Sequence, residues 1–224
     1  MGRLPQKQGQ KGSQKWLQKL VNDSPGIISS QLQKKLQLPD SENITWYSPL
    51  TDDDFAEYQD QSFLNRLDIN PSKVKLSDFW PKRGPVWDGL AKLDSGKIFL
   101  VEAKAHIPEM VSSGTGAGEK SIKLIGKSLA ETKKYLGSKS PNDWSSTFYQ
   151  YTNRLAHLYF LRVINNLPAY LVFINFVNDK EMEGPETTEE WQGAIEMLHS
   201  YLGIRKNKFS EFIIDLSIDI NALT

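Results

Sequence analysis

Residues 86–106 read VWDGLAKL-DSG-KIFLVEAKAH, two strand-like runs joined by a short loop that ends in glycine. This pattern is typical of a β-hairpin. If residues 94–96 form a three-residue loop with the glycine in the left-handed conformation, Leu93 lies opposite Lys97. The numbers of facing residues then add to 190, which predicts the register of the whole hairpin.

This register predicts that two carboxylates face each other. Asp88 lies opposite Glu102, and Lys104 and His106 follow Glu102 at steps of two, so they share its face. Directly opposed side chains have Cβ atoms about 4.5–5.5 Å apart, and like charges at that separation repel. The preceding run Ile98–Val101 is apolar on both faces, as in a central strand that is covered on both sides. Charges at the end of such a strand are costly unless they are paired or bind a metal.

A divalent cation would turn this repulsion into coordination, since Mg²⁺ prefers carboxylate oxygens and keeps open water positions. The lysine can then stabilise negative charge on a phosphate or help to align an activated water. The alternative is an ion pair of Lys104 with Asp88 or Glu102 that serves the fold only. An Asp that faces a Glu across two strands is a poor structural arrangement, which favours the metal.

The hairpin resembles a known motif at this point. Asp88 is followed fourteen positions later by Glu102-Ala103-Lys104, and this spacing resembles the PD-(D/E)xK nuclease superfamily. The resemblance implies an α/β fold (mixed α+β), with a restriction-endonuclease-like mixed β-sheet flanked by helices, over about residues 50–220. It also implies that Asp88 and Glu102 bind the metal, that the Ala103 carbonyl adds a ligand, and that Lys104 assists the attacking water.

Two neighbouring segments bear on this resemblance. Thr51 opens a predicted helix that runs to about Leu67. Superfamily members often carry an acidic residue on the helix before the hairpin, and Glu57 is the candidate here, with Asp60 behind it. The match departs from the superfamily where Val86-Trp87 stands in place of the proline that often precedes the Asp.

Several polar and basic residues are candidates for contact with nucleic acid. Within a helix predicted over 145–166, one face carries Gln150, Asn153, Arg154 and His157. These four side chains either face the cleft of Glu102 or bond to neighbouring backbone, and both interpretations stay open. Some superfamily branches carry Gln-x-x-x-Tyr on such a helix, and here Arg154 stands in the tyrosine position. His106, Lys82 and Arg83 are added as candidates near the hairpin, and the cations Lys82 and Arg83 can approach a phosphate.

The remaining pattern predicts two parts. Residues 1–40 form a basic, partly disordered helical segment, with residues 1–14 disordered, and residues 41–224 form the nuclease-like domain. Positions 1–36 hold seven Lys and Arg against one Asp. This segment either grips a phosphate backbone or is solvated on one face and packed on the other. Further helices are predicted near 120–136 and 187–202, and buried strands at 169–176 and 212–216.

The composition restricts the class of protein and its compartment. The chain has 224 residues, is 39% hydrophobic and has zero formal net charge, which fits one domain with a real core. It contains no cysteine, which excludes disulfides and thiolate metal sites and favours a reducing cytoplasm. No signal peptide is expected, and the longest apolar run is about ten residues against the roughly twenty of a membrane helix.

The sequence therefore predicts a cytoplasmic Mg²⁺- or Mn²⁺-dependent nuclease that hydrolyses phosphodiester bonds of DNA. Two alternatives stay open, both on the same fold: an inactive nucleic-acid-binding module and a protein-interaction module. The choice between DNA and RNA, the mode of cutting, and the oligomeric state, a dimer included, are not determined by the sequence.

Overall fold

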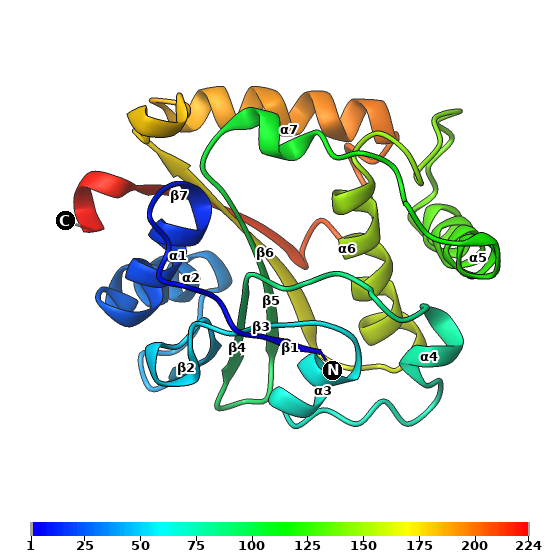
Figure 1. The fold of residues 1–224 in the computed structure, drawn as a ribbon, viewed down its shortest axis with the longest axis horizontal. Helices are drawn as coiled ribbons and strands as arrows, with labels where there is room; N and C mark the ends of the chain where they lie inside the picture. The colour runs from blue at the N-terminus through cyan, green and yellow to red at the C-terminus, as the bar shows by residue number, and fades with distance from the viewer. Residues whose placement is uncertain (1, 224) are drawn as a thin grey trace.

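The protein, described over residues 2–223 by a computed structural model, is built on a five-stranded mixed sheet (Figure 1). The strand order is β2-β4-β5-β6-β7. Neighbours pair antiparallel from β2 to β5 and parallel from β5 to β7. The five strands are β2 (Ile44–Ser48), β4 (Gly89–Leu93), β5 (Ile98–Lys104), β6 (Ala169–Val177) and β7 (Ile213–Asp219). The expected mixed α/β fold is confirmed.

The predicted hairpin register is confirmed as well. Gly89 pairs with Val101 and Lys92 with Ile98, so the numbers of facing residues add to 190. The loop closes through two hydrogen bonds, from the Leu93 N–H to the carbonyl of residue 97 and from the Gly96 N–H to the Leu93 carbonyl. Gly96 has a φ of 84°, which a residue with a side chain rarely adopts.

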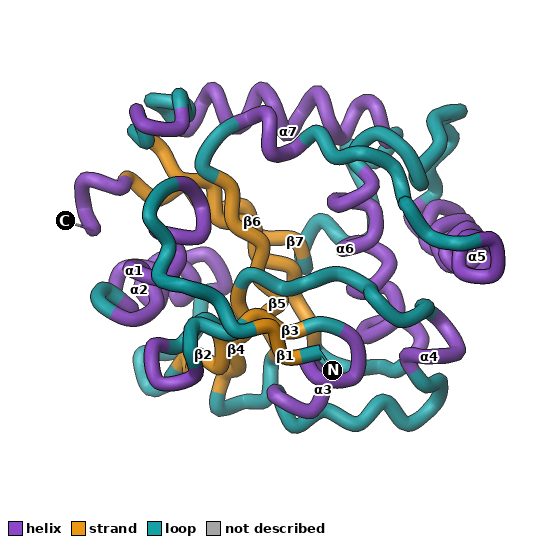
Figure 2. Tube along the Cα trace, in the orientation of Figure 1, coloured by secondary structure: helices purple, strands orange, loops and turns teal. Residues whose placement is uncertain are grey.

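Helices cover both faces of the sheet, which gives three layers (Figure 2). Leu20 and Ile28 pack with Val101 and Val172 on one face. The other face buries residues such as Leu100 under the later helices. The helices are α1 (Gly12–Asn22), α2 (Pro25–Leu36), α3 (Asp60–Arg66), α4 (Leu76–Phe79), α5 (Glu119–Leu136), α6 (Tyr149–Tyr159) and α7 (Thr188–Leu202). The first two form one cover layer, so the helical part of the basic segment shares a core with the sheet.

Two of these helices, α5 and α7, follow local sequence signals closely. The capping box of Thr187 and Glu190 is formed at the start of α7. Gly137 and Gly203 end α5 and α7 in the left-handed conformation. The helix expected over 145–166 begins later, at Tyr149, and continues beyond α6 as a π-helical turn over Phe160–Ile164.

The expected disorder of residues 1–14 is wrong for residues 2–14, which have a defined path; residue 1 lies outside the described range. Residues 2–11, here called the N-terminal arm, include β1 (Arg3–Leu4), which pairs with β3 (Glu57–Tyr58). The buried Gln18 side chain binds the arm backbone, since it accepts from the Gly9 N–H at 2.7 Å and donates to the Lys7 carbonyl at 3.1 Å. These contacts join positions too far apart in sequence for periodicity to detect.

The single helix expected over 51–67 is also wrong. The segment contains a 3-10 turn (Thr51–Asp53), then β3, then α3. Asp54 and Phe55 adopt φ values of 52° and 47°, which no α-helix can include. Asp53 and Asp54 bind the Arg3 guanidinium at 2.8 and 2.9 Å instead of beginning a helix. Glu57 therefore lies on a strand.

Within residues 2–223, no helix combines the length and apolarity that a membrane span requires.

Candidate active site

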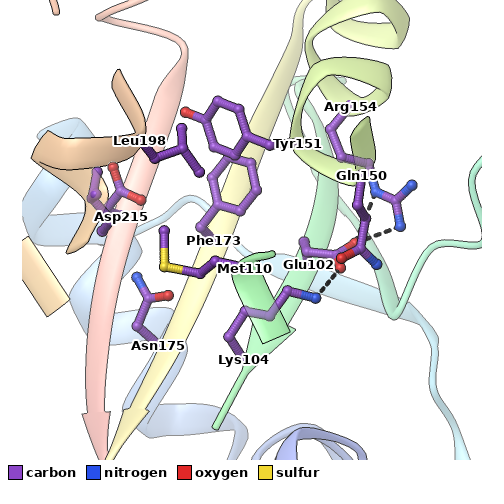
Figure 3. Close-up of a pocket in the computed structure, with 11 residues that line it drawn as sticks. Glu102, Lys104, Met110, Gln150, Tyr151, Arg154, Phe173, Asn175, Leu198 and Asp215 are labelled. Atoms are coloured by element: carbon purple, nitrogen blue, oxygen red, sulfur yellow. Dashed lines mark hydrogen bonds and ion pairs between the residues drawn. The ribbon is translucent and has the colours of Figure 1, made fainter. Parts of the chain in front are cut away.

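The candidate site lies at the carboxyl end of β5, where Glu102 is 3% exposed. Lys104 lies two residues further on the same strand, and its Nζ is 2.5 Å from Glu102 Oε1 (Figure 3). Burial alone would raise the pKa of Glu102, but Arg154 and Lys104 outweigh it and hold that pKa below its ordinary value. Burial opposes the charge of Lys104 as well, and Glu102 and Asp88 more than offset it, so the lysine pKa is raised. Both groups are ionised at neutral pH.

Arg154 projects from α6 onto the second oxygen of Glu102. Its Nε donates to Glu102 Oε2 at 2.8 Å, and its Nη2 lies 2.6 Å from the same oxygen. The guanidinium also donates to the Asn153 side chain and to the Val86 carbonyl, and it lies over the Trp87 ring, 4.9 Å from the centroid. Arg154 thus connects α6 with β5 and with the segment before β4. The contacts with this segment and with Asn153 hold the guanidinium, and the guanidinium holds Glu102.

Two further carboxylates lie beside this ion pair. Asp88 precedes β4, and its Oδ2 accepts a hydrogen bond from the Ala103 N–H at 2.8 Å. Burial, and then the charge of Glu102, raise the pKa of Asp88 to about 7. Burial, and then the charges of Asp88 and Glu102, raise the pKa of Glu57 to about 8. Glu57 thus interacts electrostatically with the predicted pair, although it comes from β3 and not from a helix.

The N-terminal arm contributes to the surroundings of these carboxylates. The Gln6 side chain donates to Glu57 Oε2 at 3.0 Å, and Leu4 pairs with Glu57 across β1 and β3. A small pocket between the first turn of α1 and Pro49 is lined by Glu57 and Asp88. Access to this side of the site is therefore bounded by a segment that the sequence predicted to be disordered.

The carboxylate oxygens at the site suit a hard cation that needs only one or two protein ligands. Among the residues that the structure describes, no three His, Cys, Asp or Glu side chains are arranged to hold a metal ion together. Mg²⁺, however, keeps several waters and commonly uses only one or two carboxylates. Asp88 and Glu102 provide two: the Asp88 carboxylate accepts from the N–H of Ala103, which follows Glu102, and the charge of Glu102 helps to raise the Asp88 pKa. The Ala103 N–H is engaged by Asp88, and the part expected of its carbonyl stays a prediction.

The polar face of α6 divides between the site and the core. Gln150 lines the pocket beside Glu102, as expected. The Asn153 Oδ1 accepts from the Arg154 guanidinium, and Arg154 donates to Glu102, so both side chains help to hold Glu102. The expectation that His157 faces the cleft is wrong: it is 1% exposed, and its Nδ1 lies 2.8 Å from the Asn153 carbonyl. Burial lowers the pKa of His157 to about 3, and aromatic rings surround it, which suits a neutral core residue.

The other predicted cations lie outside the buried cluster. His106 Nδ1 is 2.8 Å from Glu109 Oε1, just after β5. Lys82 and Arg83 are exposed in the loop before β4. That loop is held by Asp60, whose carboxylate accepts from the backbone N–H groups of Arg83 and Gly84 at 3.0 and 2.9 Å. Asp60 therefore stabilises the loop. Of the two acids that the sequence predicted for the site, Glu57 lies there and Asp60 does not.

Sequence reasoning missed several residues that the structure brings to the site. Gln6 gave no signal, because it lies in a polar stretch without periodicity. Asn175 and Asp215 did carry one, since Asn175 interrupts an otherwise apolar strand and Asp215 follows three apolar residues, and both line the pocket beside Glu102.

Comparisons of the chain with models of protein families, with curated proteins and with solved structures find no match. The function is therefore inferred from the chemistry of the site.

Proposed function

We propose that this protein is a metal-dependent nuclease that hydrolyses phosphodiester bonds of DNA. The observation that carries the proposal is the charged group at the carboxyl end of β5, where Lys104 binds Glu102 at 2.5 Å and the Asp88 carboxylate accepts a hydrogen bond from the Ala103 N–H between them. The strand order, which follows the chain from β2 to β7, and the helices on both faces agree with the restriction-endonuclease-like sheet that the motif implies. The absence of cysteine agrees with a reducing compartment such as the cytoplasm.

Each side chain has a role in this proposal. Asp88 and Glu102 would hold Mg²⁺ or Mn²⁺, with the Ala103 carbonyl as a further oxygen donor. The ion, when bound, supplies Lewis acidity and lowers the pKa of water. Lys104, kept protonated by its acidic neighbours, donates to the attacking water or to a phosphate oxygen as negative charge develops. Arg154 fixes Glu102 in one orientation through its fork of donors.

One observation favours a second candidate, a module on the same fold that binds nucleic acid without cutting it. Both oxygens of Glu102 are already engaged, by Lys104 and by Arg154. A cation at Glu102 must therefore share oxygens with these groups or displace Lys104. The two candidates differ in whether a divalent ion changes what happens to bound DNA.

The deciding experiment incubates the full chain with plasmid, linear duplex and single-stranded DNA, with Mg²⁺, with Mn²⁺ and with a chelator. Cleavage should require the divalent ion and should be lost in Asp88→Asn and Lys104→Ala, while DNA affinity survives. Matched controls come from the far end of the same hairpin, where Asp94→Asn and Lys97→Ala should cut at the wild-type rate.

Cleavage that persists in Asp88→Asn would refute the assignment of the metal site. DNA binding without cleavage under every condition would establish the second candidate instead.

A further inference from the structure

A pocket adjoins the candidate active site. It lies between strands β5, β6 and β7 and helices α6 and α7 (Figure 3). Its lining includes Glu102 and Lys104 from β5, Phe173 and Asn175 from β6, and Asp215 from β7. In the strand register Asn175 pairs with Lys104, and Phe173 lies between Glu102 and Asp215. The pocket thus extends from the proposed reaction centre across the parallel half of the sheet.

Two polar side chains of this pocket make no hydrogen bond within residues 2–223. Asn175 is 4% exposed, and its side-chain amide has no hydrogen-bond partner there. Asp215 is half-buried, lies beside Phe173 in the strand register and likewise makes no hydrogen bond, although Lys35 interacts with it electrostatically. Polar groups shielded from water are nearly always hydrogen-bonded. A ligand in the pocket can supply hydrogen bonds to both side chains.

The chemistry of the two groups restricts that ligand. Burial raises the pKa of Asp215 to about 6, so its side chain is mainly a carboxylate at pH 7 and only accepts hydrogen bonds. The ligand must then present donors to Asp215, while the Asn175 amide can both donate and accept. Between Asp215 and Glu102 in the register, Phe173 stacks on Tyr151 with ring centroids 4.8 Å apart and planes 18° apart. An aromatic wall of this kind suits a flat ring.

We propose that this pocket binds the guanine base of an unpaired nucleotide next to the phosphate at Lys104, an assignment that rests on the proposed function. Guanine presents two adjacent N–H donors and a carbonyl on one edge, which match a carboxylate and an amide. That edge is occupied in a duplex, so the base must come from a single strand or be extruded. Stacking on Phe173 adds the sequence-tolerant part of the affinity.

Met110 controls access to the pocket. It ends the 3-10 turn Ile107–Met110, and in Figure 3 its side chain lies between Lys104 and Asn175. Methionine is unbranched and adapts its shape readily, so an entering base can displace it. The guanine therefore replaces the Met110 thioether against Phe173.

The test measures binding of short single-stranded oligonucleotides to the full chain without metal, so that no cleavage is needed. Three probes carry guanine, inosine or an abasic site at one central position, and inosine lacks only the amino group. Wild-type protein should bind the guanine probe about tenfold more tightly than the inosine probe, because the hydrogen bond from that amino group to a charged acceptor is missing.

Asp215→Asn and Asn175→Leu should abolish this preference and leave affinity for the abasic probe unchanged. Glu211→Gln, an exposed change just before β7, should keep it. Neither pocket variant breaks a hydrogen bond within the described chain, so their melting temperatures should not fall.

Equal binding of guanine and inosine by the wild type, or a preference that survives Asp215→Asn, would overturn the proposal. A guanine preference in a protein that cuts no DNA would refute the proposed nuclease activity but would still support the guanine-binding pocket.

Discussion

Binding of Mg²⁺ should release protons, because two of the carboxylates at the site are partly protonated in the free protein. The pKa of Glu57 is about 8 and that of Asp88 is about 7, in both cases mainly through burial. A hard cation binds Asp88 only in its ionised form, and its positive charge also favours the ionised form of the nearby Glu57, so binding displaces protons from both. Glu102, held ionised by Arg154 and Lys104, should contribute none.

The size of the effect follows from the two pKa values. At pH 7 Glu57 is about nine-tenths protonated and Asp88 about half protonated, which together gives about 1.4 protons released per ion. At pH 9 the same groups are almost fully ionised, and the release falls to about 0.1. In Glu57→Gln the release at pH 7 should fall to about 0.5, because only Asp88 still titrates.

Calorimetry measures this directly when the titration is repeated in buffers of different ionisation enthalpy. The slope of the observed heat against buffer enthalpy is the number of protons released. Asp94→Asn, at the other end of the hairpin, is the matched control and should keep the wild-type slope. Tight Mg²⁺ binding with zero slope at pH 7, or a slope that does not change between pH 7 and pH 9, would refute the reasoning.

Arg154→Met should cost about 3–5 kcal/mol of unfolding free energy, because it leaves Glu102 buried without its main partner; a decrease below about 1 kcal/mol in a urea titration would contradict this. Without metal, stability should fall between pH 6 and pH 9 by about 2–3 kcal/mol for Glu57 alone. Its pKa is raised on folding, so its contribution is present at low pH and is lost as the pH passes about 8. In Glu57→Gln the unfolding free energy should depend less steeply on pH. A dependence as steep as that of the wild type would show that Glu57 does not cause it. Deletion of residues 2–9 should lower the slope of log affinity against log salt on duplex DNA by about 0.9 for each phosphate that the arm neutralises, whereas an unchanged slope would make the arm structural.

The hairpin could be predicted because its signals are local. A three-residue turn with Gly96 at the left-handed position fixes the register, which pairs Gly89 with Val101 and so brings Asp88 to the end of β5 where Glu102 lies. Alternation along a strand then assigns Lys104 to the face of Glu102 without knowledge of any other element. Capping residues and closing glycines are equally local, which is why the bounds of α5 and α7 were predicted closely.

The N-terminal arm could not be predicted, because its conformation depends on residues about fifty positions away. Arg3 binds Asp53 and Asp54, and these ion pairs accompany the left-handed backbone that divides the expected helix. The strand pairing that sets Leu4 beside Glu57 has no local signal either. The expected face of α6 failed in part for a related reason. Periodicity placed Arg154 and His157 on one face correctly, but it contains no information on which neighbours cover each of them.

The balance of charge at the site bears on the kind of phosphate that it accepts. At about pH 7.5, midway between the two pKa values, Glu57 is mainly protonated and Asp88 mainly ionised, so Asp88 and Glu102 offset Lys104 and Arg154 and the site is close to neutral. A divalent ion that displaces the Glu57 proton changes the total to about +1. This matches a phosphodiester, which carries one negative charge, better than a terminal phosphate with about −1.5 to −2.

We therefore expect a preference for diesters that depends on this balance. Bis(p-nitrophenyl) phosphate should be hydrolysed faster than p-nitrophenyl phosphate in the presence of Mn²⁺, although the monoester carries more charge for the ion to attract. Glu57→Gln removes one negative charge from the loaded site and should shift the ratio of the two rates toward the monoester. A wild-type enzyme that prefers the monoester, or a ratio that Glu57→Gln leaves unchanged, would show that the charges at this site do not select the substrate.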